Sequence, residues 1–309
     1  MKKKILVVVD GSIYSRRAIE YVVKMESVIK DLNLTLLNIH PKISEFLVED
    51  SRIGSKARSA LKEVTARNYE NSIRILHNAK SLMTKLGVDE NQIETVSRPV
   101  VKGIAKDIID YGRKGLYDAI VIGRRGTSRL ADVFMGNVAN SVLEHTSITP
   151  VWAIGGEFKS FKIMIAVDGS ESALRAVDHV IFMLGENPDI RITLLHVMPR
   201  LRDYCEISFE EKEDILEEAI NQGHKQCIDD FYAHAQKKIK EAGLKKSQID
   251  IKQIVSTVNR GKSIVDVAKK GNFGTVVIGR RGADDSFFLG GISRFVLDSI
   301  FNSAVWLVP

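Results

Sequence analysis

The sequence predicts an α/β protein with two tandem, open, mostly parallel five-stranded sheets that carry helices on both faces. The chain has 309 residues, which suits two domains of roughly 150 residues each. The hexapeptide VIGRRG occurs at residues 121–126 and again at residues 277–282. In each half, apolar runs alternate with amphipathic segments, which is the pattern of a parallel sheet with right-handed crossovers.

The first half contains five apolar runs that are expected to form strands. Residues 5–9 are a continuous, mostly β-branched run without polar alternation, which is typical of a strand covered on both faces. This run ends at Asp10-Gly11-Ser12, where Ser12 or Ser15 can cap a helix. The other strands are expected at residues 34–39, 92–97, 119–122 and 150–154, and the helices at residues 16–29, in a segment ending near Gly87, and at residues 103–111 and 136–145.

The second half repeats this order of strands and helices. Residues 161–167 and the following Asp168-Gly169-Ser170 repeat the first strand and turn at an offset of 158, which drifts to 156 and then 154 along the chain. The drift indicates a domain duplication with small deletions in loops. Gly155-Gly156-Glu157 is the expected linker, which gives domains at residues 1–156 and 157–309. Further strands are expected at residues 193–197, 251–255 and 275–278 and at Val305-Trp306, and helices at residues 208–242 and 263–268.

The composition favours a soluble protein of a reducing compartment. Hydrophobic residues make up 44% and charged residues 27%, and the apolar runs are far shorter than the roughly 20 residues of a membrane span. The net charge of +6 is mild and both signs alternate, so nucleic acid is not an expected partner. The two cysteines, Cys205 and Cys227, both lie in the second half, so we expect a cytoplasmic protein without a disulfide framework.

The repeated hexapeptide predicts an anion-binding turn. Gly123, Gly126 and Gly136 are separated by two and nine residues, and glycine lets backbone approach a phosphate without a side-chain clash. The amides of Asn137 and Val138 would then lie at a helix N-terminus, where the dipole favours negative charge. Glycines alone would equally suit tight turns and close helix packing, but the strand-end Asp-Gly-Ser in the same half favours a ligand site.

These motifs resemble those of the universal stress protein family, whose fold is Rossmann-like, and the two halves are similar to a tandem member over essentially the whole chain. ATP-binding members of that family carry glycine, two residues, glycine, nine residues, then glycine and serine or threonine. The first half matches this pattern but has Asn137 where the hydroxyl residue is expected. The resemblance implies a site for ATP with Mg²⁺ in which Asp10 lies near the ribose and adenine, Ile39 and Ile122 line the adenine pocket, and Gly123, Gly126, Gly136, Asn137 and Val138 hold the ribose and phosphates.

The second half departs further from the family pattern. Gly282 and Gly290 are separated by only seven residues, and Gly291 replaces the hydroxyl residue. Asp284 and Asp285 add negative charge beside the phosphate path, and like charges at close range oppose triphosphate binding. We therefore expect the first half to bind ATP better than the second, whose candidate residues are Asp168, Val197, Ile278, Gly279, Gly282, Gly290 and Gly291.

Other chemistry in the sequence is sparse. Arg124, Arg125, Arg280 and Arg281 could contact phosphate, although a solvent-facing charged turn is the favoured interpretation. No His, Cys and carboxylate spacing resembles a metal site, so Mg²⁺ is expected only with a nucleotide.

Three functions remain open. The first is a nucleotide-binding regulatory protein of the stress-response type, in which ATP occupancy biases conformation or association. The second is an ATP-using enzyme on the same fold, although the chain lacks a Walker loop and shows no nucleophile with a base, so at most slow hydrolysis is expected. The third is an interaction module that has lost nucleotide binding. The resemblance also implies that residues 151–154 pair with residues 305–308 in an intramolecular pseudo-dimer, and it leaves a homodimer open.

Overall fold

The computed structural model describes residues 2–44, 54–124, 135–185, 187–198, 213–256, 259–281 and 289–309. These residues form two compact units, Met1–Glu26 with Asp31–Ile154 (unit 1) and Ser27–Lys30 with Gly155–Pro309 (unit 2). The predicted domain limits at residues 156 and 157 stay a prediction. Each unit is an α/β domain, so the predicted fold class is confirmed.

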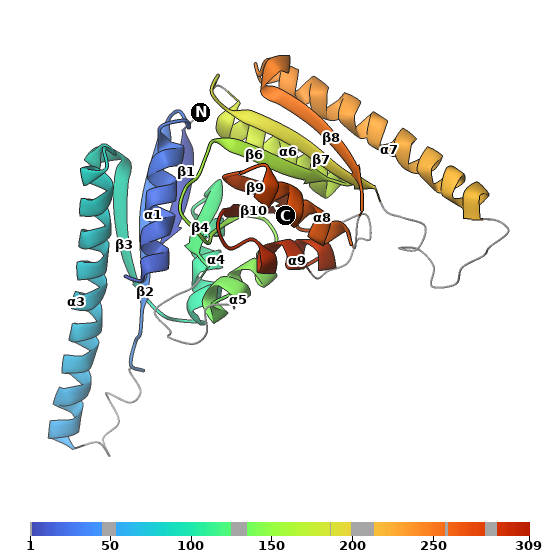
Figure 1. Cartoon of the computed structure of the whole chain (residues 1–309). Coiled ribbons are helices and arrows are strands. Elements are labelled where there is room, and N and C mark those ends of the chain that lie inside the picture. Colours follow the sequence, from blue (N-terminus) through green and yellow to red (C-terminus); the bar gives the residue numbers. More distant parts are fainter. Residues whose placement is uncertain are drawn as a thin grey trace. The chain divides into compact units, whose positions relative to one another are not determined.

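Unit 1 has a parallel sheet in the order β3-β2-β1-β4-β5 (Figure 1). Its neighbouring strands all run in the same direction. The central strands are buried on both faces because they are continuous apolar runs without alternation, as the sequence predicts. The strands are β1 (Lys3–Val8), β2 (Leu32–His40), β3 (Ile93–Pro99), β4 (Ala119–Gly123) and β5 (Val151–Ile154).

The helices of unit 1 cover its sheet in two pairs. Helix α1 contacts α3, and α4 contacts α5. The chain steps from β1 to β2 to β3 in one direction and then returns to β4 and β5 in the other, so right-handed crossovers place the two pairs on opposite faces. The helices are α1 (Ile13–Glu26), α3 (Ser55–Lys85), α4 (Ile104–Lys114) and α5 (Asn137–His145), and a 3₁₀ turn, η1, covers Glu90–Gln92.

Helix α1 begins three residues earlier than the sequence predicts. The Ser15 amide donates to Ser12 Oγ over 3.1 Å, so Ser12 is the capping residue. The helix also ends at Glu26, three residues before the predicted end. The early start places the first turn of α1 directly after the Asp10 turn.

Unit 2 repeats the topology of unit 1 with the parallel strand order β10-β9-β6-β7-β8. Helix α6 contacts α7, and α8 contacts α9. The strands are β6 (Lys162–Val167), β7 (Arg191–Met198), β8 (Ile249–Val255), β9 (Thr275–Gly279) and β10 (Ala304–Val308). The helices are α6 (Glu171–Leu184), α7 (Glu213–Glu241), α8 (Arg260–Lys270) and α9 (Gly291–Ser299), with a 3₁₀ turn, η3, at Lys246–Gln248.

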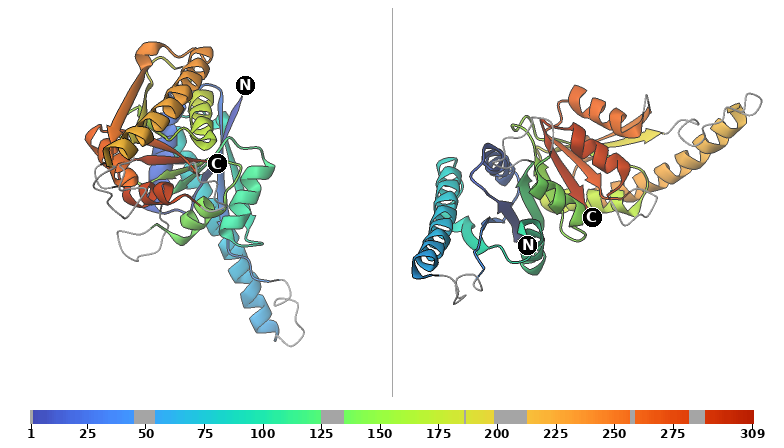
Figure 2. Two further views of the ribbon diagram at one scale, coloured as in Figure 1. Left: turned by 90° about the vertical axis from the view of Figure 1, so that its right-hand side faces the viewer. Right: turned by 90° about the horizontal axis from the view of Figure 1, so that it is seen from below.

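Helices α3 and α7 are much longer than the strands that they cover. They contain 31 and 29 residues, and an α-helix rises about 1.5 Å per residue. Each helix therefore projects beyond the sheet of its own unit (Figure 2). None of the described helices is both long and apolar enough to cross a membrane.

Each unit has a fully buried tryptophan on its last strand. In unit 1, Trp152 packs edge-on against Tyr21 of α1, with ring centroids 6.4 Å apart. In unit 2, Trp306 packs edge-on against His179 of α6, with ring centroids 5.5 Å apart. His179 occupies the position of Tyr21 at the repeat offset of 158, so a titratable ring replaces a phenol in the core of unit 2.

Candidate functional site

The predicted site residues of unit 1 that follow strands lie at one edge of its sheet. Asp10 follows β1, Ile39 is the penultimate residue of β2, and Ile122 and Gly123 end β4. The register pairs Val8 with Leu37 and Val7 with Val121, so the three strands end side by side. This is the carboxyl edge, where open parallel sheets bind ligands.

The Asp10 turn is held by two hydrogen bonds. The Ser12 amide donates to Asp10 Oδ1 over 2.9 Å, and the intervening Gly11 adopts a φ of 77°. The buried Asn38 side chain donates from Nδ2 to the Val9 carbonyl over 2.6 Å. The side chain on β2 therefore fixes where Asp10 leaves β1, a role that the sequence prediction missed.

The start of α5 is tied to the end of β4. The Gly136 amide donates to the Arg124 carbonyl over 2.8 Å, which returns the chain to this strand. Gly136 is the N-cap residue, with a φ of −65°, and has no side chain to cap the helix. Among the described residues no side chain caps this helix, so its first-turn amides, including those of Asn137 and Val138, can donate to an anion. Gly126 lies outside the described residues.

Gly123 has a packing role of its own. A Cβ atom built there would lie 2.6 Å from the carbonyl carbon of Tyr14, at the start of α1. Glycine is therefore required at this position for the close approach of helix and strand. This observation supports the packing alternative for Gly123. It does not concern Gly136, which is the N-cap residue of α5.

Unit 2 reproduces the same edge with different side chains. Asp168 Oδ1 accepts from the Ser170 amide over 3.1 Å and from Ser170 Oγ over 2.6 Å. His196 replaces Asn38 and donates from Nδ1 to the Val167 carbonyl over 2.9 Å. Val197 lies near the end of β7, and Ile278 and Gly279 end β9. The sequence did carry a signal for Asn38 and His196, because a polar residue recurs at this position at the repeat offset of 158.

The two phosphate-site helices begin at equivalent points. In unit 2 the Gly290 amide donates to the Arg280 carbonyl over 3.1 Å, and Gly290 is the N-cap of α9, whose first residue is Gly291. The shorter spacing in this half therefore does not displace the helix start. Ser293 Oγ also donates to the Gly279 carbonyl over 2.8 Å, which joins α9 to the end of β9. Gly282, Asp284 and Asp285 lie outside the described residues.

The favoured interpretation of the arginine turn is wrong for two of its four members. Arg124 is 3% exposed and Arg280 is 5% exposed, so neither faces solvent. Their amides donate to the carbonyls of Ile154 and Val308, the last strands of their units, so both residues extend the sheet. Burial lowers the pKa of the Arg280 guanidinium. Arg281 is partly exposed, and Arg125 lies outside the described residues.

A pocket of about 540 Å³ opens beside the Asp10 turn, between α1 and α3. It contains Asp10 but none of the other predicted site residues of unit 1. Arg16 reaches it from α1 and pairs with Glu20 over 2.9 Å, while Arg74 reaches it from α3. The sequence prediction missed this pocket because α3 is brought to the turn only by tertiary packing.

Metal-binding and thiol chemistry are limited in the described part of the chain. No group of three or more His, Cys, Asp or Glu residues that could hold a metal ion occurs there. Cys227 is an exposed free thiol, and Cys205 lies outside the described residues.

Comparison with known proteins identifies the family. The Universal stress protein family model matches the chain twice, over residues 1–155 and 160–309. The chain belongs to the universal stress protein family. The repeated sheet topology of the two units is the structural counterpart of this double match.

Solved structures share the fold over nearly the whole chain. A universal stress protein from Archaeoglobus fulgidus DSM 4304 has a TM-score of 0.64 and 18% sequence identity, covering 99% of this chain and 97% of that chain. A functionally unknown protein from Pseudomonas aeruginosa PAO1 has a TM-score of 0.57 and 16% identity, covering 99% of this chain and 92% of that chain. No curated protein matches the sequence. At these identities the likeness establishes the tandem fold alone.

Proposed function

We propose that this universal stress protein is a stress-response regulatory protein that binds ATP with Mg²⁺ at the carboxyl edge of the unit 1 sheet. Occupancy of the site, rather than turnover, is its function. The observation that carries the proposal is the hydrogen bond from Gly136 to Arg124, which fixes an uncapped helix start at the end of β4. An uncapped helix start favours a phosphate group because its amides and dipole both favour negative charge.

The donors and acceptors at this edge fit the three parts of a nucleotide. The amides of Asn137 and Val138 suit the phosphates, and the Asn137 side chain adds a donor where the family pattern has a hydroxyl. Asp10 uses Oδ1 to hold the turn, which leaves Oδ2 to accept from a ribose hydroxyl. Ile39 and Ile122 supply apolar surface for adenine. Mg²⁺ would be held by the phosphates, since the described residues offer no cluster of their own.

The alternatives remain distinguishable. An ATP-using enzyme needs a positioned nucleophile or base. The described residues of the unit 1 edge include two candidate bases, Asp10, which already accepts from the Ser12 amide, and His40, whose Nδ1 lies 3.2 Å from the Pro41 carbonyl oxygen. An interaction module without nucleotide is favoured by the Gly123 packing role, since that glycine has a structural reason to be present. We rank the site of unit 2 below that of unit 1 because Asp284 and Asp285 oppose phosphate there.

The decisive variant is Asn137→Asp. A carboxylate in the first turn suits the helix dipole and should preserve stability, but it repels a phosphate at the same amides. We expect calorimetric titration of the full-length protein with ATP and Mg²⁺ to show at least roughly tenfold weaker binding in this variant. Gly291→Asp, at the matching position of unit 2, is the control and should leave the tighter site unchanged.

Each outcome selects one function. Adenine nucleotide released by heating the purified protein, together with an Asn137→Asp effect, supports the proposal. Absence of both bound nucleotide and binding heat would leave the interaction module. Multiple-turnover ATP hydrolysis that is abolished by Gly126→Val would establish the enzyme instead.

A further inference from the structure

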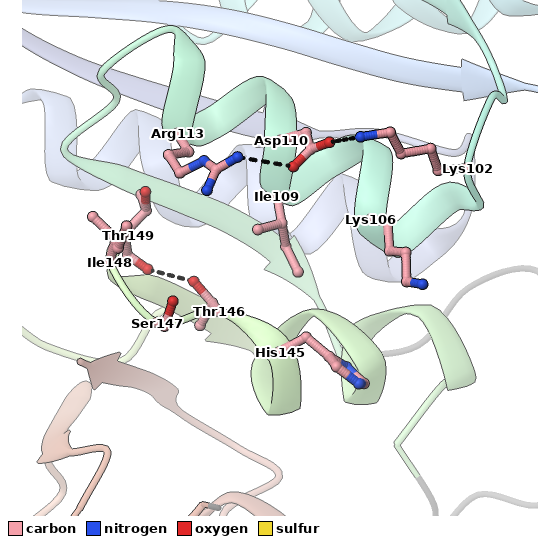
Figure 3. Close-up of a pocket in the computed structure, with 10 residues that line it drawn as sticks. All are labelled: Lys102, Lys106, Ile109, Asp110, Arg113, His145, Thr146, Ser147, Ile148 and Thr149. Atoms are coloured by element: carbon pink, nitrogen blue, oxygen red, sulfur yellow. Dashed lines mark hydrogen bonds and ion pairs between the residues drawn. The ribbon is translucent and has the colours of Figure 1, made fainter. Parts of the chain in front are cut away.

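A second polar pocket lies in unit 1, in the groove between α4 and the segment that ends α5 (Figure 3). Its volume is about 400 Å³, which is within the usual range for small-molecule sites. One wall comes from α4 and the residues before it, and the other comes from residues 145–149. Residues 146–149 precede β5 and so lie toward the amino edge of the sheet, opposite the proposed nucleotide edge.

The cations of this groove exceed its carboxylates. Lys102, Lys106 and Arg113 line it with a single carboxylate, Asp110. Lys102 Nζ lies 2.8 Å from Asp110 Oδ2, and Arg113 lies 3.5 Å from Asp110 Oδ1. The hydrogen bond from Lys102 lowers the pKa of Asp110, so this carboxylate stays ionised and neutralises that lysine. Among the described residues that line the groove, Arg113 and Lys106 then remain as two cations without a further carboxylate.

Lys106 and Arg113 mark the two ends of the groove. Within the described residues Lys106 has no hydrogen-bond or ion-pair partner. It lies at the end where His145 faces α4, whereas Arg113 lies at the end formed by Ser147, Ile148 and Thr149 (Figure 3). Arg113 lies seven positions after Lys106, or about 10 Å along a helix axis. The groove can therefore accept two anionic groups rather than one.

A hydroxyl at the Arg113 end has no partner among the described residues. Thr149 is 6% exposed and lines the pocket, yet its hydroxyl makes no hydrogen bond to any described residue. Its carbonyl accepts from Thr146 Oγ1 over 2.9 Å, which fixes the loop. This hydroxyl is free to hydrogen-bond to a ligand in the groove, and an oxyanion is a suitable acceptor. Ser147 supplies a second, exposed hydroxyl at the same end.

In unit 2 the residues that correspond to Lys106 and Thr149 both have partners within the protein. Lys262, which corresponds to Lys106, pairs with Asp266 over 3.5 Å. Ser303, which corresponds to Thr149, donates from Oγ to the Phe273 carbonyl over 2.9 Å. Residues 145–147, His-Thr-Ser, are replaced by Ser-Ile-Phe at residues 299–301. The unpartnered cation and hydroxyl are therefore particular to unit 1 and do not follow from the shared fold.

We propose that the α4–α5 groove of unit 1 binds a small phosphorylated acid, that is, a phosphate ester with a second anionic group. The phosphate lies at the Arg113 end, where the guanidinium and the hydroxyls of Ser147 and Thr149 donate to it. The second anionic group extends toward Lys106. This site is separate from the proposed ATP site and does not depend on it.

The test is a titration of the isotope-labelled full-length protein, followed by amide chemical shifts at constant ionic strength. The three probes are inorganic phosphate, glycerol 3-phosphate and 3-phosphoglycerate, with acetate as the monoanion control. We expect saturable shifts around Arg113 and Thr149 with all three phosphates, and tightest binding for 3-phosphoglycerate. Equal effects of acetate and phosphate would overturn the proposal.

Matched variants assign each contact. Arg113→Gln should weaken all three phosphates roughly tenfold, and Thr149→Val roughly fivefold, whereas Thr149→Ser should retain binding. Lys106→Gln should remove only the advantage of 3-phosphoglycerate over glycerol 3-phosphate, and Lys262→Gln in unit 2 should change nothing. Arg113 and Lys106 are exposed, so those variants should fold normally. Binding that is unchanged in Arg113→Gln, or an advantage that survives Lys106→Gln, would sink the idea.

Discussion

His179 should make unit 2 sensitive to acid. Burial against Trp306 lowers the pKa of this imidazole from its ordinary value of 6.5 to about 3. In the unfolded chain the same ring binds a proton near pH 6.5, so the unfolded state binds more protons below that pH. The stability that neutral His179 preserves is therefore complete above about pH 6.5 and is lost as the pH falls from there toward 3.

The loss in the free energy of unfolding depends on how far the pH lies below the unfolded pKa of His179. Each pH unit within the interval costs about 1.4 kcal/mol. Since pH 5 lies about 1.5 pH units below the unfolded pKa of 6.5, we expect unit 2 to lose about 2 kcal/mol relative to pH 8. Carboxylates also titrate in this range, so the effect must be read as a difference between matched proteins.

Tyr21 of unit 1 supplies the matched substitution, since it holds the corresponding position against Trp152. The chain has two tryptophans, so Trp152→Phe leaves Trp306 as the single tryptophan reporter, within unit 2. Urea unfolding followed by its fluorescence at pH 8 and pH 5 should show about 2 kcal/mol more loss with His179 than with His179→Tyr. His179→Phe repeats the comparison without a hydroxyl. The same loss in all three proteins would refute the reasoning.

Three further substitutions test the packing of the two units. Gly123→Ala should cost about 1–3 kcal/mol in urea unfolding, because the new Cβ meets the Tyr14 backbone at 2.6 Å. Gly279→Ala should cost less, since its nearest atom is the Ser172 side-chain oxygen; a larger cost there would contradict this account. Tyr117→Phe should cost about 1 kcal/mol, because the phenol donates to Thr35 Oγ1 over 2.9 Å. Phe273, the counterpart of Tyr117 in unit 2, is also buried, so an aromatic ring without a hydroxyl suits this position. If Tyr117→Phe lowered the free energy of unfolding by several kcal/mol, the loss of one hydrogen bond would not explain it.

The elements of the fold could be predicted because their signals are local. Residues 5–9 and 119–122 are continuous apolar runs, and such runs identify buried parallel strands wherever they occur. The ends of elements depend on capping contacts, as the capping role of Ser12 rather than Ser15 illustrates. The candidate nucleotide edge could be predicted because parallel strands place their carboxyl ends together, which brings Asp10, Ile39 and Gly123 to one edge.

Contacts between distant segments could not be predicted in the same way. The hydrogen bond from Asn38 to the Val9 carbonyl and the burial of Arg124 depend on which strands become neighbours. The unpartnered hydroxyl of Thr149 depends on how α4 packs against the segment after α5. In each case the residue type is compatible with several environments, and only its neighbours select one.

The order of apolar runs and their repetition establish that this protein has two similar α/β units and which strand ends carry Asp-Gly-Ser and glycine turns. Hydrophobic periodicity and the sequence repeat are sufficient for these predictions, because neighbouring residues set the local backbone geometry of strands and helices. The packed structure shows that α5 and α9 start at equivalent points despite their different loop lengths. It also shows that a lysine and a hydroxyl of the α4–α5 groove of unit 1 have no partner among the described residues. Burial and hydrogen-bond satisfaction are properties of the packed chain, so residues far apart in the sequence settle them together.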